Sequence, residues 1–159
     1  MRFASGIIPK RCTSFVVYLI PMTDHIKTGA LGETAAAQFL TTQNFLILDR
    51  NVRMPFGEID IVARDSEGTL IFVEVKTLSH SSTLMPEDNM TRAKFKKLSR
   101  VCSAYANSHP TLVDDAFGWR IDLVSVIINP PSPMPSEYHL FDFGKNNFAV
   151  LHYKNISLH

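Results

Sequence analysis

The chain has 159 residues, of which 45% are hydrophobic and 19% are charged. This length and composition fit one globular domain and exclude a disordered tail, a coiled coil and a collagen-like repeat. The 16 Lys and Arg residues nearly balance the 15 Asp and Glu residues, which gives a net charge of +1. Because nucleic-acid-binding domains are often strongly basic, this total argues mildly against one, unless it averages over opposed patches.

The first 27 residues are predicted to be an N-terminal extension that is either disordered or the product of a wrongly assigned start, with Met22 as the alternative start. Its apolar run, residues 15–20, is too short for a membrane span or for the apolar segment of a signal peptide. We therefore expect no membrane partner. Residues 28–159 are predicted to form a single domain.

The two cysteines indicate in which cellular compartment the protein is found. Cys12 and Cys102 lie far apart and match neither a disulfide framework nor a zinc motif. The histidines show no short ligand spacing either. A reducing cytoplasm is therefore the predicted location.

Helix and strand patterns alternate along the rest of the chain. An apolar stripe from Leu31 to Leu40 at helical spacing predicts a helix over 30–43. The proline-rich segment 129–136 excludes regular structure. The other expected elements are strands over 45–52, 57–65, 69–78, 119–128, 137–143 and 148–153, and a second helix over about 88–107. This order predicts an α/β fold, a mixed β-sheet flanked by helices, with the apolar strand 119–128 near its centre.

The strands over 57–65 and 69–78 are predicted to form a hairpin. The short loop between them ends in Gly68, which is expected to take the left-handed conformation of a tight turn. Alternation along both strands then gives the hairpin one apolar and one polar face. The core side is expected to consist of Ile59, Ile61, Val73 and Val75.

Four ionisable residues lie together on the polar face of this hairpin. The register places Asp60 opposite Glu74 and Glu58 opposite Lys76. Because like charges directly opposite each other destabilise a sheet, the two acids require a compensating charge, for which a divalent cation is suited. Mg²⁺ favours one or two carboxylates with waters and a phosphate, and Lys76 offers a point charge to a phosphate or an attacking water. These groups are the components of a site that hydrolyses phosphodiesters.

The same residues form a recognisable signature. GEIDIV, a gap of thirteen residues between Asp60 and Glu74, and then FVEVKT resemble the PD-(D/E)XK signature of restriction-endonuclease-like nucleases. More narrowly, the chain resembles the YraN-like family of uncharacterised, nuclease-like proteins over about residues 31–126. The motifs that carry this resemblance are Gly32-Glu33, Ile47-Leu48, Asn51, Arg53, Gly57-Glu58-Ile59-Asp60, Val73-Glu74-Val75-Lys76-Thr77, Lys94, Leu98 and Arg120-Ile121-Asp122.

The resemblance implies a restriction-endonuclease-like three-layer core, similar in fold to Holliday-junction resolvases and restriction enzymes. It also implies that Asp60 and Glu74 hold Mg²⁺, with Mn²⁺ as the alternative ion. Lys76 is expected to assist the attacking water, and Glu33 in the first helix is expected to complete the metal shell. Glu58 and Thr77 are expected to support the site.

Several of these residues have structural alternatives. The hairpin face is also explained as a solvated surface in which Glu58 and Lys76 form a cross-strand ion pair. Glu33 in the first turn of its helix would favour the helix dipole. Asp122 is either an outer carboxylate of the site or the partner of Arg120, and we favour the structural role.

The second predicted helix has a basic face and no acid between residues 92 and 100. A basic face beside a phosphate site suits nucleic-acid binding, whereas a solvated helix face is the alternative. Lys94 projects into the apolar stripe beside Leu98 and Val101. We therefore expect it to point toward the hairpin carboxylates, with snorkelling to solvent as the alternative. The predicted nucleic-acid-binding residues are Arg92, Lys94, Lys96, Lys97 and Arg100.

Together these features predict a Mg²⁺-dependent endonuclease that hydrolyses DNA. The alternatives are a non-catalytic domain that binds nucleic acid or a partner, and a structural domain that binds neither metal nor nucleic acid. The similarity to junction resolvases leaves a homodimer open, although no interface is recognisable in the sequence. The near-zero net charge would then hide two local patches of opposite sign, an acidic metal site and a basic helix.

Overall fold

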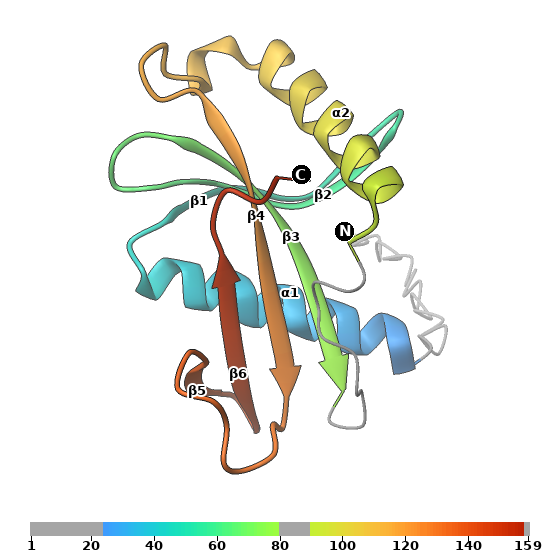
Figure 1. Cartoon of the computed structure of the whole chain (residues 1–159), viewed down its shortest axis with the longest axis vertical. Helices are drawn as coiled ribbons and strands as arrows, with labels where there is room; N and C mark the ends of the chain where they lie inside the picture. Colours follow the sequence, from blue (N-terminus) through green and yellow to red (C-terminus); the bar gives the residue numbers. More distant parts are fainter. Residues whose placement is uncertain (1–23, 80–89, 158–159) are drawn as a thin grey trace, which may run out of the picture.

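The computed structural model describes residues 24–79 and 90–157. Within these ranges the chain forms a mixed six-stranded sheet in the order β1-β2-β3-β4-β6-β5 (Figure 1). Only β3 and β4 are parallel neighbours; the other adjacent strands are antiparallel. The elements are α1 (Asp24–Thr42), β1 (Leu46–Met54), β2 (Gly57–Arg64), β3 (Leu70–Ser79), α2 (Arg92–Ser108), the short 3-10 helix η2 (Pro110–Leu112), β4 (Trp119–Ile128), β5 (His139–Phe143) and β6 (Asn146–Tyr153).

The predicted order of elements is confirmed, and β4 lies between β3 and β6 near the centre of the sheet as expected. The helix ends differ. Helix α1 begins at Asp24 rather than at residue 30, so residues 24–27 of the expected extension are helical; residues 1–23 lie outside the described ranges. Helix α2 begins at Arg92 rather than near residue 88, because the Thr91 side chain caps it. Residues 129–136 contain neither helix nor strand, as the prolines predict.

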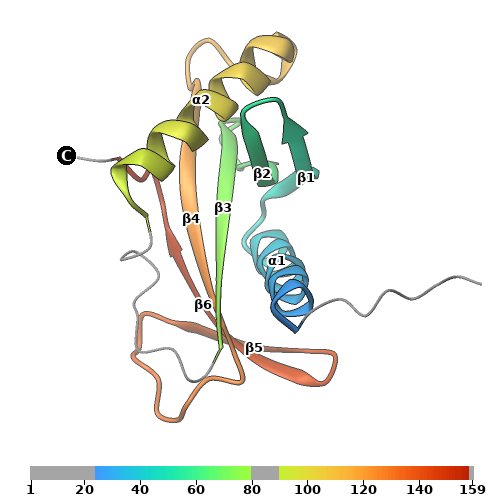
Figure 2. The ribbon, with the colours of Figure 1, turned by 90° about the vertical axis from the view of Figure 1, so that its right-hand side faces the viewer.

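The two helices cover opposite faces of the sheet, each over its own apolar cluster (Figure 2). The cluster under α1 includes Ala36, Leu40, Val73, Val75, Val124 and Phe148. The cluster under α2 includes Ile59, Val62, Phe72, Leu98, Val101, Tyr105 and Ile121. The sheet is therefore buried on both sides, which explains the near-continuous apolar run of β4. The expected three-layer α/β core, a mixed sheet between helices, is confirmed.

The turn between β2 and β3 forms as predicted. Gly68 has a φ of 99°, which favours glycine. The Asp65 carboxylate accepts hydrogen bonds from the Glu67 and Thr69 amides at 3.1 and 2.9 Å. These bonds hold the loop closed and fix the register of the two strands.

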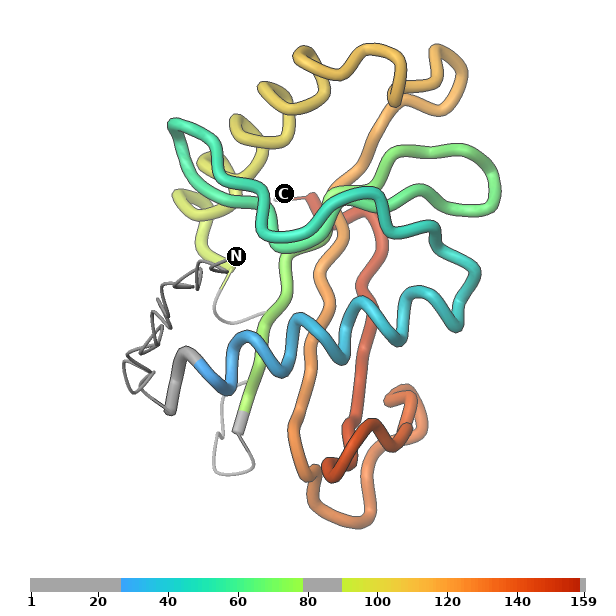
Figure 3. The backbone as a smooth tube through the Cα atoms, turned by 180° about the vertical axis from the view of Figure 1, so that it is seen from behind, coloured from blue at the N-terminus to red at the C-terminus, as the bar shows by residue number. Residues whose placement is uncertain are grey.

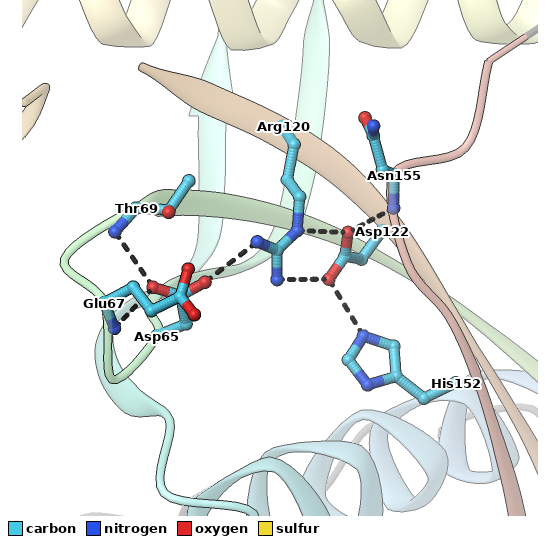
Figure 4. Close-up of polar contacts among 7 residues, drawn as sticks. All are labelled: Asp65, Glu67, Thr69, Arg120, Asp122, His152 and Asn155. Atoms are coloured by element: carbon cyan, nitrogen blue, oxygen red, sulfur yellow. Dashed lines mark hydrogen bonds and ion pairs between the residues drawn. The ribbon is translucent and has the colours of Figure 1, made fainter. Parts of the chain in front are cut away.

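A buried ion-pair network joins this turn to β4 and to the chain after β6 (Figure 4). The Arg120 guanidinium donates to Asp122 at 3.0 Å and to Asp65 at 2.8 Å. Asp122, which is 0% exposed, also lies 2.9 Å from His152 Nε2 and accepts from the Asn155 amide at 2.8 Å. Asp122 is thus the partner of Arg120, in the structural role that we favoured.

No helix among the described residues is long and apolar enough to cross a membrane.

Candidate functional site

The site lies where two neighbouring strands separate. The predicted hairpin register holds for the four residue pairs that end at Ile61 and Val73. Beyond them β2 continues beside β1, and β3 continues beside β4. We call this point the strand fork. The predicted cross-strand pairs past the strand fork, Asp60 with Glu74 and Glu58 with Lys76, are absent from the described ladder.

At the strand fork, the side chain of Asp60 accepts a hydrogen bond from the backbone of β3, whose neighbour β2 no longer pairs with it. Its Oδ2 atom accepts a hydrogen bond of 2.7 Å from the amide of Val75 on β3. In β1, Asn51 lies between the residues that pair with Ile59 and Ile61, and it has a φ of 54°. This left-handed conformation, which asparagine tolerates, coincides with the bend that takes the β1–β2 hairpin away from β3. The Asp60 carboxylate is thereby fixed at the edge of β3.

The end of the β1–β2 hairpin lies against α2 (Figure 3). A Cβ atom on Gly57 would lie 3.2 Å from Val101 Cγ2 and 3.3 Å from Lys97 Cε, so glycine permits this approach. The same bend turns Ile59 into the cluster under α2, whereas Ile61 packs under α1. The expectation that Ile59 and Ile61 share one face is therefore wrong, because it assumed a straight strand.

Glu74 and Lys76 point from β3 toward the α2 side of the sheet. Their neighbours Val73 and Val75 pack under α1, and successive side chains of a strand alternate between faces. Lys76 Nζ donates to Glu74 Oε1. The side chain of Lys76 is 29% exposed and that of Glu74 is 19% exposed, so both remain accessible to a ligand. The cross-strand ion pair of Lys76 with Glu58 does not form.

Burial and charge crowding raise the pKa of Asp60 from its usual 3.8 to about 7. Burial has the largest effect, followed by the negative charge of Glu74, and Glu33 also raises the value. The hydrogen bond from the Val75 amide and the charge of Lys76 act in the opposite direction without cancelling this effect. An excess of negative charge therefore surrounds Asp60, which is the condition under which a carboxylate site attracts a cation.

Glu33 approaches Asp60 from the opposite face of the sheet to Glu74. It lies on α1, which packs under Val73 and Val75, and its side chain is half-buried. Because α1 begins at Asp24, Glu33 lies beyond the first turn, and the alternative in which it favours the helix dipole is wrong. Its effect on the pKa of Asp60 is the observation that ties it to the site.

A close contact between Gly32 and Thr77 sets the position of α1 over β3. A Cβ atom on Gly32 would lie 1.8 Å from Thr77 Oγ1 and 2.8 Å from Thr77 Cβ. Only glycine permits the helix to approach the strand so closely. Thr77, expected as a supporting residue, thus supports the site by receiving the helix that carries Glu33.

Substituting Gly32 by alanine tests this contact. Rotation of Thr77 cannot relieve the overlap with its Cβ atom, so Gly32→Ala is expected to lower the free energy of unfolding by roughly 1–3 kcal/mol. Gly29→Ala is the matched control, because no atom lies within 4 Å of its added Cβ; we expect a gain of up to about 1 kcal/mol. Urea unfolding measures both. Similar changes in the two variants would contradict the contact.

Glu74 and Lys76 line a cleft of about 230 Å³, which lies between β3, the end of the β1–β2 hairpin and the first half of α2. Its walls include cationic side chains from α2 as well as the acid and the lysine of β3. Asp60 is not among the residues that line it. The lining residues are Gly57, Glu58, Glu74, Lys76, Met90, Lys94, Lys97, Leu98 and Val101.

The predicted faces of α2 are confirmed. Leu98, Val101 and Tyr105 are buried, whereas the side chains of the basic face, Arg92, Lys96, Lys97 and Arg100, are exposed. The side chain of Lys94 is exposed and not buried in the apolar stripe, although it lies on the side of the hairpin acids, as expected. It lies in the first turn of α2 and lines the cleft together with Glu74.

The donor set at the strand fork suits a hard divalent cation. Mg²⁺ takes oxygen ligands, commonly one or two carboxylates together with waters and a phosphate, and Asp60 and Glu74 are two carboxylates coupled through space. In the described ranges, no group of three or more His, Cys, Asp or Glu side chains could hold a metal ion. Glu33, Asp60 and Glu74 stay the predicted ligands, and the charges of Glu33 and Glu74 both act on Asp60.

The raised pKa of Asp60 predicts pH-dependent stability. The folded protein holds this proton more tightly than the unfolded chain, so stability is lost as the pH rises from about 4 to about 7. Asp60→Asn keeps an oxygen for the Val75 amide. We expect it to exceed the stability of the wild type by up to about 4 kcal/mol at pH 8 and to match it near pH 4. Urea unfolding without divalent ions at both pH values measures this; equal stability at pH 8 would contradict the raised pKa of Asp60.

Two features of the site were not anticipated from the sequence. The first is the Val75 amide, whose role depends on β2 leaving β3. The second is the stacking of Arg100 over the Phe56 ring, with the guanidinium carbon 3.9 Å from the ring centroid. Two glycines in the sequence do signal close contacts between elements: Gly32 interrupts a run of good helix formers, and Gly57 ends a turn.

The chain is similar to proteins of one uncharacterised family. The model of the uncharacterised protein family UPF0102 matches residues 32–126. A UPF0102 protein of Syntrophus aciditrophicus is 36% identical over 109 residues, covering 69% of this chain and 83% of the relative. A UPF0102 protein of Paenarthrobacter aurescens is 44% identical over 101 residues, covering 64% of this chain and 80% of the relative.

Two solved structures are more distantly similar. A complex of EndoMS with double-stranded DNA aligns with a TM-score of 0.36 and 17% identity, covering 59% of this chain and 34% of that chain. SfsA of Pyrococcus furiosus in complex with Ca²⁺ aligns with a TM-score of 0.34 and 18% identity, covering 65% of this chain and 58% of that chain. Neither likeness assigns a residue of the site.

Proposed function

Because the chain belongs to the uncharacterised protein family UPF0102, a restriction-endonuclease-like family of nuclease-like proteins, we propose that it is a Mg²⁺-dependent endonuclease that hydrolyses DNA phosphodiester bonds. The observation that carries the proposal is the placement of Asp60, Glu74 and Lys76 at the strand fork. A half-buried acid with a raised pKa, a second acid and a lysine meet there beside a cleft with cationic walls. Perturbed carboxylates beside a cleft are typical of functional sites.

Each residue has a separate role in this proposal. Asp60 and Glu74 would hold the Mg²⁺ ion, with Mn²⁺ as a substitute, and Glu33 adds negative charge from the opposite face of β3. When bound, the ion supplies a Lewis acid for the phosphate and lowers the pKa of water. Lys76 Nζ, which pairs with Glu74, would orient the attacking water and stabilise negative charge on the phosphate.

The walls of the cleft supply the contacts to the nucleic-acid backbone. Lys94 and Lys97 line the same cleft as Glu74 and Lys76, and the rest of the basic face extends along α2. Phosphate contacts of this kind position the duplex and carry little sequence information. Binding through them should therefore weaken steeply as salt concentration rises. Hydrolysis joins one water to the phosphodiester and leaves a phosphomonoester and a hydroxyl group.

A panel of labelled linear and branched DNAs tests the proposal. The purified protein is incubated with each DNA in Mg²⁺, in Mn²⁺ and in EDTA, and the products are separated by length. We expect cleavage of at least one form in either ion and none in EDTA. Absence of cleavage from every form in both ions would contradict the proposal.

The second candidate is a non-catalytic domain that binds nucleic acid or a protein partner and keeps the nuclease fold. One observation favours it: the described residues do not assemble a three-ligand metal group. It predicts DNA binding that is unchanged by EDTA and no cleavage in Mg²⁺ or Mn²⁺. Filter binding with and without EDTA, beside the cleavage panel, separates the two candidates.

A further inference from the structure

An exposed aromatic residue, Phe56, directly precedes two residues that line the cleft. Phe56 lies in the turn between β1 and β2, and 42% of it is exposed. The Arg100 guanidinium lies over the ring, 3.9 Å from its centroid. This pairing covers the ring with a planar cation and fixes its orientation. Phe56 is therefore braced, that is, held in position by its contact with Arg100, unlike an isolated apolar residue on the surface.

The neighbours of this pair place it beside the proposed site. Gly57 and Glu58, the next residues in the chain, line the cleft that contains Glu74 and Lys76. Val101, next to Arg100 in α2, lines the same cleft. Phe56 and Arg100 are therefore each one residue away in sequence from the lining of the cleft.

The fold does not depend on this ring to hold the hairpin against α2. Gly57 packs closely on Val101 and Lys97, because an added Cβ atom would lie 3.2 and 3.3 Å from their side chains. Ile59 anchors the same hairpin in the cluster under α2. Phe56 belongs to neither apolar cluster, which leaves its ring available for a ligand.

We propose that Phe56, braced by Arg100, stacks on an unpaired nucleobase next to the phosphate in the cleft. This inference rests on the proposed function and specifies its substrate class. Bases inside a continuous duplex are already stacked on their neighbours, so the ring gains a partner only where a base is unpaired. Stacking on an aromatic side chain is strong and tolerant of base identity. The site would therefore select DNA with an unpaired nucleotide at a branch, flap or gap over continuous duplex.

Binding without cleavage tests this inference separately from catalysis. The probes are a blunt duplex and the same duplex with a short single-stranded tail that carries 2-aminopurine as its first unpaired base. Affinities and 2-aminopurine fluorescence are measured in EDTA. We expect the wild type to bind the tailed DNA about tenfold more tightly than the blunt duplex and to quench its fluorescence. Phe56→Leu should remove both effects and leave affinity for the blunt duplex unchanged.

Two further variants make the result specific. Phe56→Trp should retain the preference for tailed DNA. Phe143→Leu is the matched control, because Phe143 is also exposed, at 37%, but lies in β5, the strand at the opposite edge of the sheet from β1 (Figure 1). Urea unfolding verifies that each variant is folded. An equal loss of affinity for both DNAs in Phe56→Leu, or no preference in the wild type, would overturn the inference, whereas a loss of cleavage alone would bear only on the proposed function.

Discussion

Replacing Lys76 by alanine is expected to reduce Mg²⁺-dependent DNA cleavage about 10³-fold while the protein stays folded. Lys76 is 29% exposed, its ammonium group contacts Glu74, and it belongs to neither apolar cluster, so both clusters stay complete in the variant. The catalytic effect is large because the ammonium group is the cation of β3 that faces the cleft beside the acids. Without it, charge that develops on the phosphate loses a fixed donor.

Initial cleavage rates on the best DNA of the panel, at saturating Mg²⁺, measure this effect. Lys145→Ala is the matched control, since Lys145 is an exposed lysine in the turn between β5 and β6, and we expect it to leave the rate unchanged. Urea unfolding should show Lys76→Ala to be folded. Cleavage by this variant at the wild-type rate would sink the assignment of Lys76.

Replacing Asp122 by alanine is expected to lower the free energy of unfolding by about 3–5 kcal/mol. Asp122 is fully buried, and its carboxylate receives Arg120, His152 and the Asn155 amide. Burial alone would raise its pKa, but these hydrogen bonds together hold the pKa below the usual value. Removing the carboxylate leaves the Asn155 amide without its acceptor and takes from the Arg120 guanidinium one of its two carboxylate partners, Asp65 being the other, and the cost of burying these groups is no longer offset.

Urea unfolding at pH 7 measures the loss. Asp142→Ala, which removes an exposed carboxylate from β5, is the control and should change stability by less than about 0.5 kcal/mol. Because the pKa of Asp122 is lowered on folding, its contribution is present above pH 4 and is lost as the pH falls further. The gap between wild type and variant should therefore narrow in acid. A cost below about 1 kcal/mol at pH 7 would show that the network contributes little.

Much of the fold could be predicted from local sequence. Apolar strands bounded by turn residues, and two helices with clear apolar stripes, lead to the correct order and to the central position of β4. The linked motifs over about 31–126 also lead to the family, which the match over 32–126 confirms. These features depend on neighbouring residues and on spacing, which a sequence displays directly.

The geometry of the site could be predicted only in part. The acids and the lysine were identified, but a straight ladder was assumed, whereas β2 leaves β3 after Ile61 and Asp60 bonds to the Val75 amide instead. The bend at Asn51 depends on a backbone conformation that several residue types adopt. Helical projection puts Lys94 in the apolar stripe, but a projection does not show where the helix begins. Its place in the first turn of α2 leaves it exposed.

The small net charge of +1 is an average over two separated groups. The acids Glu33, Asp60 and Glu74 gather around the strand fork, and the basic face extends along α2. A near-neutral total therefore does not exclude a nucleic-acid partner. Under the proposed function, binding would depend on one local surface and on a cation at the acids, rather than on the charge of the whole protein.

Calorimetric titration of Mn²⁺ into the wild type and into Asp60→Asn at pH 8 tests the central claim most directly. At this pH the Asp60 carboxyl group, with its pKa of about 7, is ionised in the wild type and available to the ion. The account predicts a binding isotherm for the wild type that is lost in Asp60→Asn, although this variant is folded. Equal heats from the two proteins, or no binding to the wild type, would contradict a metal site at Asp60 and Glu74.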